Sequence, residues 1–156
     1  MIGGGIITLL LIGYIFCLPR QLFHVPYSTV VTDRNNELLG ARIALDGQWR
    51  FPPRTTTPAK IQACFIEFED NHFFHHWGVN PVSIGRAAYQ NLKAGRVISG
   101  GSTITMQTIR LARNNPRTFS EKFIEMIWAT RLEFRYSKEK ILSLYAVSYT
   151  HLTLPT

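Results

Sequence analysis

The chain has 156 residues, which is enough for one modest domain. Seventeen Lys and Arg against ten Asp and Glu give a formal net charge of +7. Its two cysteines, Cys17 and Cys64, lack the spacing of a disulfide framework, a redox pair or a zinc site, so these classes of small protein are excluded.

The excess positive charge lies in the second half. Residues 1–85 hold six Lys or Arg and six Asp or Glu, whereas residues 86–140 hold eleven Lys or Arg and four Glu. Such a block attracts anions, which could be nucleic acid, anionic lipid headgroups or phosphorylated substrates. Next to the apolar segment described below, a lipid-linked phosphate is favoured over nucleic acid.

Residues 2–19 carry no charge and are mostly Ile, Leu, Gly and aromatic. As a helix they would extend about 27 Å, close to the thickness of a bilayer's hydrocarbon core, so residues 1–20 are expected to form a retained transmembrane anchor. A cleaved signal peptide is the alternative, but the basic start and the small-residue cleavage site are missing. Arg20 is the only flanking charged side chain. By the positive-inside rule it favours placing the part of the chain after the segment on the cytoplasmic side, which is opposite to the topology adopted below.

Residues 21–56 are predicted to form a linker with a short β hairpin. Two strand-like runs lie around 30–32 and 37–44, and Asn35–Asn36 between them is a turn signal. A second turn is expected at 46–49, DGQW, before Arg50 and Phe51.

From residue 57 onward the pattern is helical, and the predicted fold class is therefore mainly α. Thr57–Pro58 and Asn80–Pro81 are helix-start signals, Gly95 is a stop, and Thr118 with Glu121 has capping-box spacing. Helices are expected at about 59–69, 81–94, 103–112 and 119–135, with a last one after Ser137.

The stretch at 67–80, EFEDNHFFHHWGVN, concentrates carboxylates, histidines and rings where the first of these helices should end. Partial removal from water by the rings would suit Glu69 to general acid or base work near neutral pH. A solvent-facing Glu69–Asp70 pair at a helix end is the plain alternative.

A metal site is another interpretation, because Glu69, His72 and His76 are three and four residues apart. The run lacks the H-E-x-x-H order, and Trp77–Gly78 should end a helix at once. We therefore expect no dedicated metal site, and we expect His75 and His76 to make hydrogen bonds that fix the loop.

Two further segments could bind an anion. In 95–107, GRVISGGSTITMQ, the glycines let backbone amides approach a ligand and Ser102 and Thr103 can cap a helix, although the segment lacks the Gly-Lys-Ser/Thr of a P-loop.

In 117–126, RTFSEKFIEM, Lys122 and Glu125 can share a helix face. A plain capped helix and a surface salt bridge are the respective alternatives. Carboxylates in contrasting surroundings, as at Glu69 and Glu125, are expected where acid and base roles are divided.

Together these segments resemble the family 51 glycosyltransferases, the peptidoglycan-polymerising modules of class A penicillin-binding proteins and monofunctional transglycosylases. The first family motif, Glu-Asp-x-x-Phe-x-x-His-x-Gly, is met by Glu69, Asp70, Phe73, His76 and Gly78. The second, Gly-Gly-Ser-Thr-Ile-Thr-Gln-Gln, is met by Gly100, Gly101, Ser102, Thr103, Ile104, Thr105 and Gln107, with Met106 at the first Gln. The third, a basic residue then Lys-x-x-Glu, is met by Lys122 and Glu125, with Glu121 at the basic position. Met106, GVNP at 78–81 and GRVISGG at 95–101 resemble the 1C-type class A penicillin-binding proteins.

The resemblance implies a partial lysozyme-like helical lobe that polymerises lipid II by inverting transfer from an undecaprenyl-pyrophosphate donor. Glu69 would be the general base, and Glu125 would organise a cationic cluster or an associated divalent ion. The substrate-binding residues implied are Asp70, Phe73, His76, Arg86, Gly101, Ser102, Thr103, Gln107, Arg117 and Lys122. No cofactor is required, although Mg²⁺ or Mn²⁺ at the pyrophosphate is compatible with the family's chemistry.

The implied partners are lipid II, the nascent glycan strand, the membrane and other cell-wall synthesis proteins, with no nucleic acid. The implied place is the bacterial inner membrane, single-pass, with the catalytic part on the periplasmic or outer face. The alternative is a membrane-anchored lysozyme-like hydrolase or lytic transglycosylase, since a carboxylate in a helical lobe serves both chemistries. Its weakness is that a hydrolase has no pyrophosphate to neutralise.

The resemblance spans about 28–145 and stops within a fourth motif, SKEKILSLY. We therefore expect a partial glycosyltransferase domain at 57–145 and an unrelated or artefactual tail at 146–156. On this interpretation the chain is truncated, unstable and inactive by itself.

Overall fold

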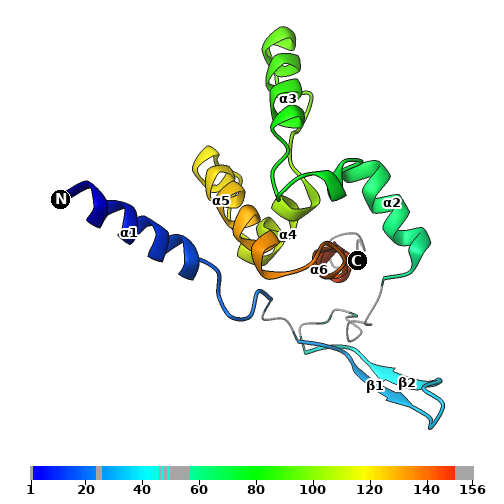
Figure 1. The fold of residues 1–156 in the computed structure, drawn as a ribbon. Coiled ribbons are helices and arrows are strands. Elements are labelled where there is room, and N and C mark those ends of the chain that lie inside the picture. The colour runs from blue at the N-terminus through cyan, green and yellow to red at the C-terminus, as the bar shows by residue number, and fades with distance from the viewer. Residues whose placement is uncertain (1, 24–25, 46, 48, 50–56, 150–156) are drawn as a thin grey trace.

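The computed structural model describes residues 2–23, 26–45, 47, 49 and 57–149. Their elements are α1 (Ile2–Phe16), β1 (Thr29–Thr32), β2 (Leu38–Arg42), α2 (Ala59–Glu69), the 3-10 turn η1 (Phe73–His75), α3 (Pro81–Ala94), α4 (Ile104–Arg113), α5 (Phe119–Arg135) and α6 (Lys138–Tyr149). The predicted mainly α class with a small hairpin is confirmed. Figure 1 shows α4, α5 and α6 gathered in the middle, with α1 and the hairpin extending away from them.

The helix α1 is shorter than the predicted anchor. It has 15 residues, which corresponds to about 22 Å, and it ends at Phe16. Pro19 is the physical reason, because a proline disfavours helical backbone at the residue before it. Among the residues that the structure describes, no helix combines the length and the apolar character that a membrane span requires.

The hairpin pairs Thr29 with Arg42 and is antiparallel, with an irregular register between Val31 and Thr32. Its turn is built by Asp33, whose Oδ1 accepts from the backbone N–H groups of Asn35 and Glu37, each at 2.8 Å. Asn36 has a φ of 63°, a conformation that asparagine tolerates, so the predicted Asn-Asn turn is confirmed. In the second predicted turn, residues 46 and 48 lie outside the described residues, and Gly47 N donates to the carbonyl of Ala44 at 2.9 Å.

The helix starts follow the predicted caps, with one exception. The side chains of Asn80, Thr103 and Thr118 accept hydrogen bonds from the first turns of α3, α4 and α5. The prediction for α2 was wrong by one residue: Pro58 itself is at the N-cap position without a side-chain bond. Thr57 instead accepts from Gln62 Nε2 through its backbone carbonyl, at 2.6 Å.

The core is centred on α4, which packs against both α5 and α6. Its buried face carries apolar and hydroxyl side chains together, and the hydroxyls are satisfied internally: Thr105 donates to Glu133 and Thr108 to the carbonyl of Ile104. Fully buried partners come from η1, α5 and α6, and they are Phe73, Leu132, Ile141 and Tyr145. The central helix thereby fixes the positions of both neighbours.

The helix α3 stands apart from this core (Figure 1). Only Ala87 is buried on it, and Gly95 ends it in the left-handed conformation, as predicted. The loop that follows is tied back to α3, since Asn91 Oδ1 accepts from the N–H groups of Ile98 and Ser99 at 2.8 and 2.9 Å. This tie orients the glycine-rich segment toward α4.

The helix α6 continues to Tyr149, four residues into the segment predicted as a tail. Ser137 accepts from Lys140 N at 3.3 Å, as expected for its cap. The domain boundaries drawn from the sequence stay predictions.

Candidate functional site

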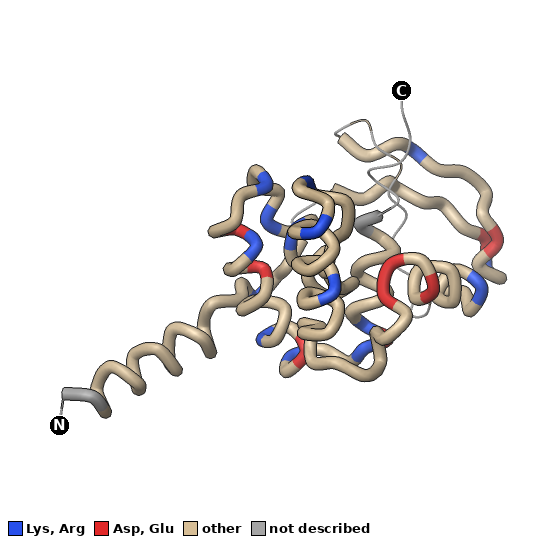
Figure 2. The backbone as a smooth tube through the Cα atoms, turned by 90° about the horizontal axis from the view of Figure 1, so that it is seen from above, with Lys and Arg blue, Asp and Glu red and all other residues tan. Residues whose placement is uncertain are grey.

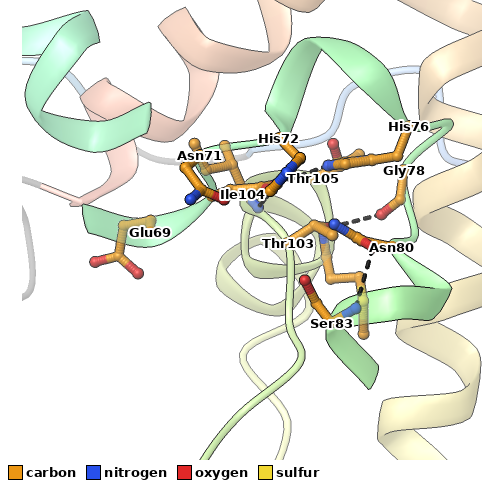
Figure 3. A network of polar contacts seen from close by, with 12 residues as sticks. Glu69, Asn71, His72, His76, Gly78, Asn80, Ser83, Thr103, Ile104 and Thr105 are labelled. Carbon is orange, nitrogen blue, oxygen red and sulfur yellow. Dashed lines mark hydrogen bonds and ion pairs between the residues drawn. The ribbon is translucent and has the colours of Figure 1, made fainter. Parts of the chain in front are cut away.

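Glu69 is the last residue of α2, and the extended backbone of Asp70, with a φ of −163°, ends the helix there. Glu69 is partly buried, and its Oε2 accepts from Gln107 Nε2 of α4 at 2.9 Å. The first and second motifs therefore meet through these two side chains. Figure 3 shows Glu69 to one side of the hydrogen-bonded network that holds His76, Gly78 and Thr103.

Asp70 joins the histidine loop to the start of α4. Its Oδ2 accepts from Ile104 N at 3.2 Å and lies 2.8 Å from His76 Nε2, and both side chains are buried. A carboxylate suits this place, because the first N–H groups of a helix lack partners within the helix. The expectation that a histidine hydrogen bond fixes the loop is confirmed at His76.

The remaining first-motif positions pack into the protein. Phe73 is fully buried, with Lys138 Nζ 4.4 Å from its ring centre. Gly78 has a φ of 84°, and its carbonyl accepts from Thr103 Oγ1 at 2.6 Å. Both residues serve the packing of the loop on α5 and α6.

In the glycine-rich segment, a Cβ at Gly101 would lie 2.7 Å from Ile84 Cα, so this glycine allows close packing against α3. Of the amides at the start of α4, Ile104 N donates to Asp70 and Met106 N donates to Thr103. The predicted anion site at this helix end is therefore partly occupied by the protein's own acceptors.

A polar cleft of about 220 Å³ lies in front of Glu69. It brings together five of the predicted site residues, two from the first motif, two from the second motif and one from α3: Glu69, Asp70, Ser102, Thr103 and Arg86. Arg86 is the cation among its lining residues. A carboxylate and a guanidinium thus face the same small space.

Glu125 lies beside this region but is bound differently from the prediction. Its two carboxylate oxygens accept from Arg110 Nε and Nη2 at 2.8 and 2.7 Å, and Nη2 also reaches Ser102 Oγ at 3.3 Å. Hydrogen bonding to Glu125 raises the pKa of Arg110 above its ordinary value. The predicted partner, Lys122, is partly buried and forms no ion pair with any described residue, while Arg117 is exposed.

Three residues of this region were missed by sequence reasoning: Arg110, Glu133 and Lys138. Lys138 Nζ donates to the carbonyl of His76 at 2.7 Å and to Glu133 Oε1 at 2.8 Å, which ties the histidine loop to α5 and α6. Arg110 follows Gln107 by three residues, so both side chains can lie on the same face of the helix. This spacing was the one sequence feature that could have indicated Arg110 as a residue of the site.

Within the described ranges, no three His, Cys, Asp or Glu residues are grouped to hold an ion. Both oxygens of Glu125 accept hydrogen bonds from Arg110, and a divalent ion at the pyrophosphate stays a prediction.

The described residues form a mainly helical module with a polar cleft, and comparison with known proteins gives the family. The chain belongs to the transglycosylase family, whose profile matches residues 39–150. It is 43% identical over 129 residues to penicillin-binding protein 1C of Escherichia coli, covering 81% of the chain and 17% of that protein. It is 34% identical over 147 residues to penicillin-binding protein 1F of Bacillus subtilis, covering 90% of the chain and 20% of that protein. The resemblance drawn from the three motifs is confirmed, and the chain spans at most about a fifth of the length of these relatives.

Proposed function

We propose that the module polymerises lipid II into glycan strands, with Glu69 as the general base. The observation that carries the proposal is the placement of Glu69 at the polar cleft, held through Oε2 by Gln107 and faced by Arg86. Among contacts between described residues, no hydrogen bond occupies Glu69 Oε1. That oxygen is the one we assign to proton transfer.

In the proposed step Glu69 takes the proton from the 4-hydroxyl of the acceptor. The acceptor oxygen forms a bond to the anomeric carbon of the donor strand, with inversion. The bond from that carbon to the pyrophosphate oxygen breaks, and undecaprenyl pyrophosphate leaves with the electron pair. Cations placed where that charge develops would stabilise the transition state.

Arg86 and Arg110 are the cations best placed for this role, with Lys122 and Arg117 as further candidates. Arg86 lines the cleft, and Arg110 is held next to Ser102 by Glu125. Glu125 then acts by fixing Arg110, and no step is routed through a divalent ion.

The membrane is part of the proposal because the substrate is lipid-linked. We propose an inner-membrane enzyme with its site on the periplasmic or outer face, a lysozyme-like lobe, and other cell-wall synthesis proteins as partners. Figure 2 shows Lys and Arg distributed over the helical part, while α1 carries neither, which supports an apolar segment beside a cationic lobe. Such a lobe suits an anionic leaving group at a membrane surface.

The test is glycan-strand formation from lipid II. Because the chain spans a small part of its relatives, we would assay the chain itself and a hybrid in which residues 39–150 replace the matched segment of Escherichia coli penicillin-binding protein 1C. Glu69→Gln should lower kcat of the hybrid by about 10²-fold or more, because a general base is lost. Glu139→Gln, which changes an exposed carboxylate of α6 that does not line the cleft, is the matched control and should retain most activity.

Equal turnover of the hybrid with and without Glu69→Gln would contradict the proposal. Cleavage of unlipidated peptidoglycan, with no use of lipid II, would favour the lytic alternative instead. Polymerisation by the 156-residue chain alone would contradict the expectation that the chain is inactive by itself.

A further inference from the structure

Gln107 is hydrogen-bonded on both sides. Its Nε2 donates to Glu69 Oε2 at 2.9 Å, and its Oε1 accepts from the hydroxyl of Tyr145 at 3.3 Å. The three side chains come from α2, α4 and α6, so the contact links three separate helices.

Tyr145 is held rigidly enough to orient the amide. It is fully buried, and its ring packs edge-on against Phe65 of α2 with ring centres 5.2 Å apart. A glutamine amide has two orientations that exchange its donor and acceptor ends. The carboxylate of Glu69 only accepts, so it draws Nε2 toward itself, and the hydroxyl of Tyr145 holds the other end of the amide by donating to Oε1.

The geometry points to Tyr145 as a positioning residue for Glu69, acting through Gln107. This inference rests on the proposed role of Glu69 as the base. Tyr145 does not line the cleft, so its effect on the reaction would pass through the orientation of the Gln107 amide. Without the Tyr145 hydroxyl, the Gln107 amide loses its second anchor and can move, and the carboxylate that it holds moves with it.

The direct test is a double-mutant cycle on turnover in the hybrid enzyme. Tyr145→Phe keeps the ring and removes the hydroxyl, and it should lower kcat roughly threefold to tenfold with KM nearly unchanged, as expected for one neutral hydrogen bond. Gln107→Ala should lower kcat further. In the Gln107→Ala background Tyr145→Phe should have no additional effect, because the path from Tyr145 to Glu69 is already broken.

The matched control is Tyr136→Phe, which removes a hydroxyl from a second tyrosine that is partly buried and packs on the same core. It should leave kcat unchanged. If the double variant lost kcat by the product of the two single losses, the inference would be overturned, because a purely structural role of Tyr145 would act independently of Gln107. An equal loss in Tyr136→Phe would overturn it as well.

A second measurement is independent of turnover. In the ¹⁵N-labelled 156-residue chain, the side-chain amide resonances of Gln107 should move in Tyr145→Phe and stay in place in Tyr136→Phe. Unmoved Gln107 resonances in Tyr145→Phe overturn the inference whatever the activity. If Glu69→Gln leaves turnover intact while the Gln107 resonances respond to Tyr145→Phe, the proposed function fails and the orientation of Gln107 by Tyr145 is upheld.

Discussion

At Gly78 the backbone adopts a φ of 84° and passes directly against α5. A Cβ placed there would lie 2.6 Å from the carbonyl carbon and oxygen of Ala129. The conformation alone disfavours other residues, and the contact removes the space that a methyl group would need. This first-motif glycine is therefore required by the fold of the loop that carries Asp70 and His76.

We predict that Gly78→Ala lowers the free energy of unfolding by about 3 kcal/mol, from backbone strain and overpacking together. The matched control is Gly85→Ala within α3, where an added Cβ would meet open space and helix propensity should raise stability by up to about 1 kcal/mol. Urea unfolding followed by circular dichroism would measure both. Equal midpoints for the two variants would contradict the role given to Gly78.

At the scale of elements, the helix limits could be predicted because their signals are local. A cap such as Thr118 and a stop such as Gly95 depend on a few neighbouring residues in the chain. The pairing of Glu125 with Arg110 could not be predicted in this way, because it depends on how α4 packs against α5. The same holds for Gln107, whose contact with Glu69 joins residues 38 positions apart.

The segment after α1 is also held by contacts that no local pattern predicts. The guanidinium of Arg135 in α5 donates to the carbonyls of Pro19 and Arg20, the latter at 2.6 Å, and Arg131 donates to that of Ile15 at 3.2 Å. Leu18 and Leu22 of the same segment are buried. The end of α1 is thus fixed to α5 by both polar and apolar contacts.

We predict that Arg135→Ala releases this segment while leaving the core folded. Three carbonyls near the end of α1 accept from arginine side chains, and losing the Arg135 contacts should make local opening easier. Limited trypsin digestion, monitored by mass spectrometry, should show faster cleavage after the exposed Arg20. Arg96→Ala, an exposed arginine in the loop after α3, is the control and should leave that rate unchanged. An unchanged rate in Arg135→Ala would show that Leu18 and Leu22 hold the segment by themselves.

Over the whole molecule, the excess of basic residues makes ionised carboxylates important to the folded state. Two carboxyl groups sit in the first turns of helices that carry the core, Glu121 in α5 and Glu139 in α6. Hydrogen bonds from Arg113 hold the pKa of Glu121 below its ordinary value of 4.5. The pKa of Glu139 is lowered by hydrogen bonds from its own backbone N–H and from Ser137.

The direction of the acid effect follows from these lowered pKa values. As the pH falls, the unfolded chain takes up protons at these two positions before the folded chain does. The stabilisation is therefore complete above the ordinary pKa of 4.5, and it is lost as the pH falls through the lowered pKa values of the folded state. We therefore predict that the urea midpoint decreases between about pH 5 and about pH 3, and that Glu121→Gln with Glu139→Gln flattens this decrease. The single variants should each remove part of the slope, and their effects should add because the two carboxyls lie on different helices. A double variant with the wild-type slope would mean that Glu121 and Glu139 do not set the acid limit.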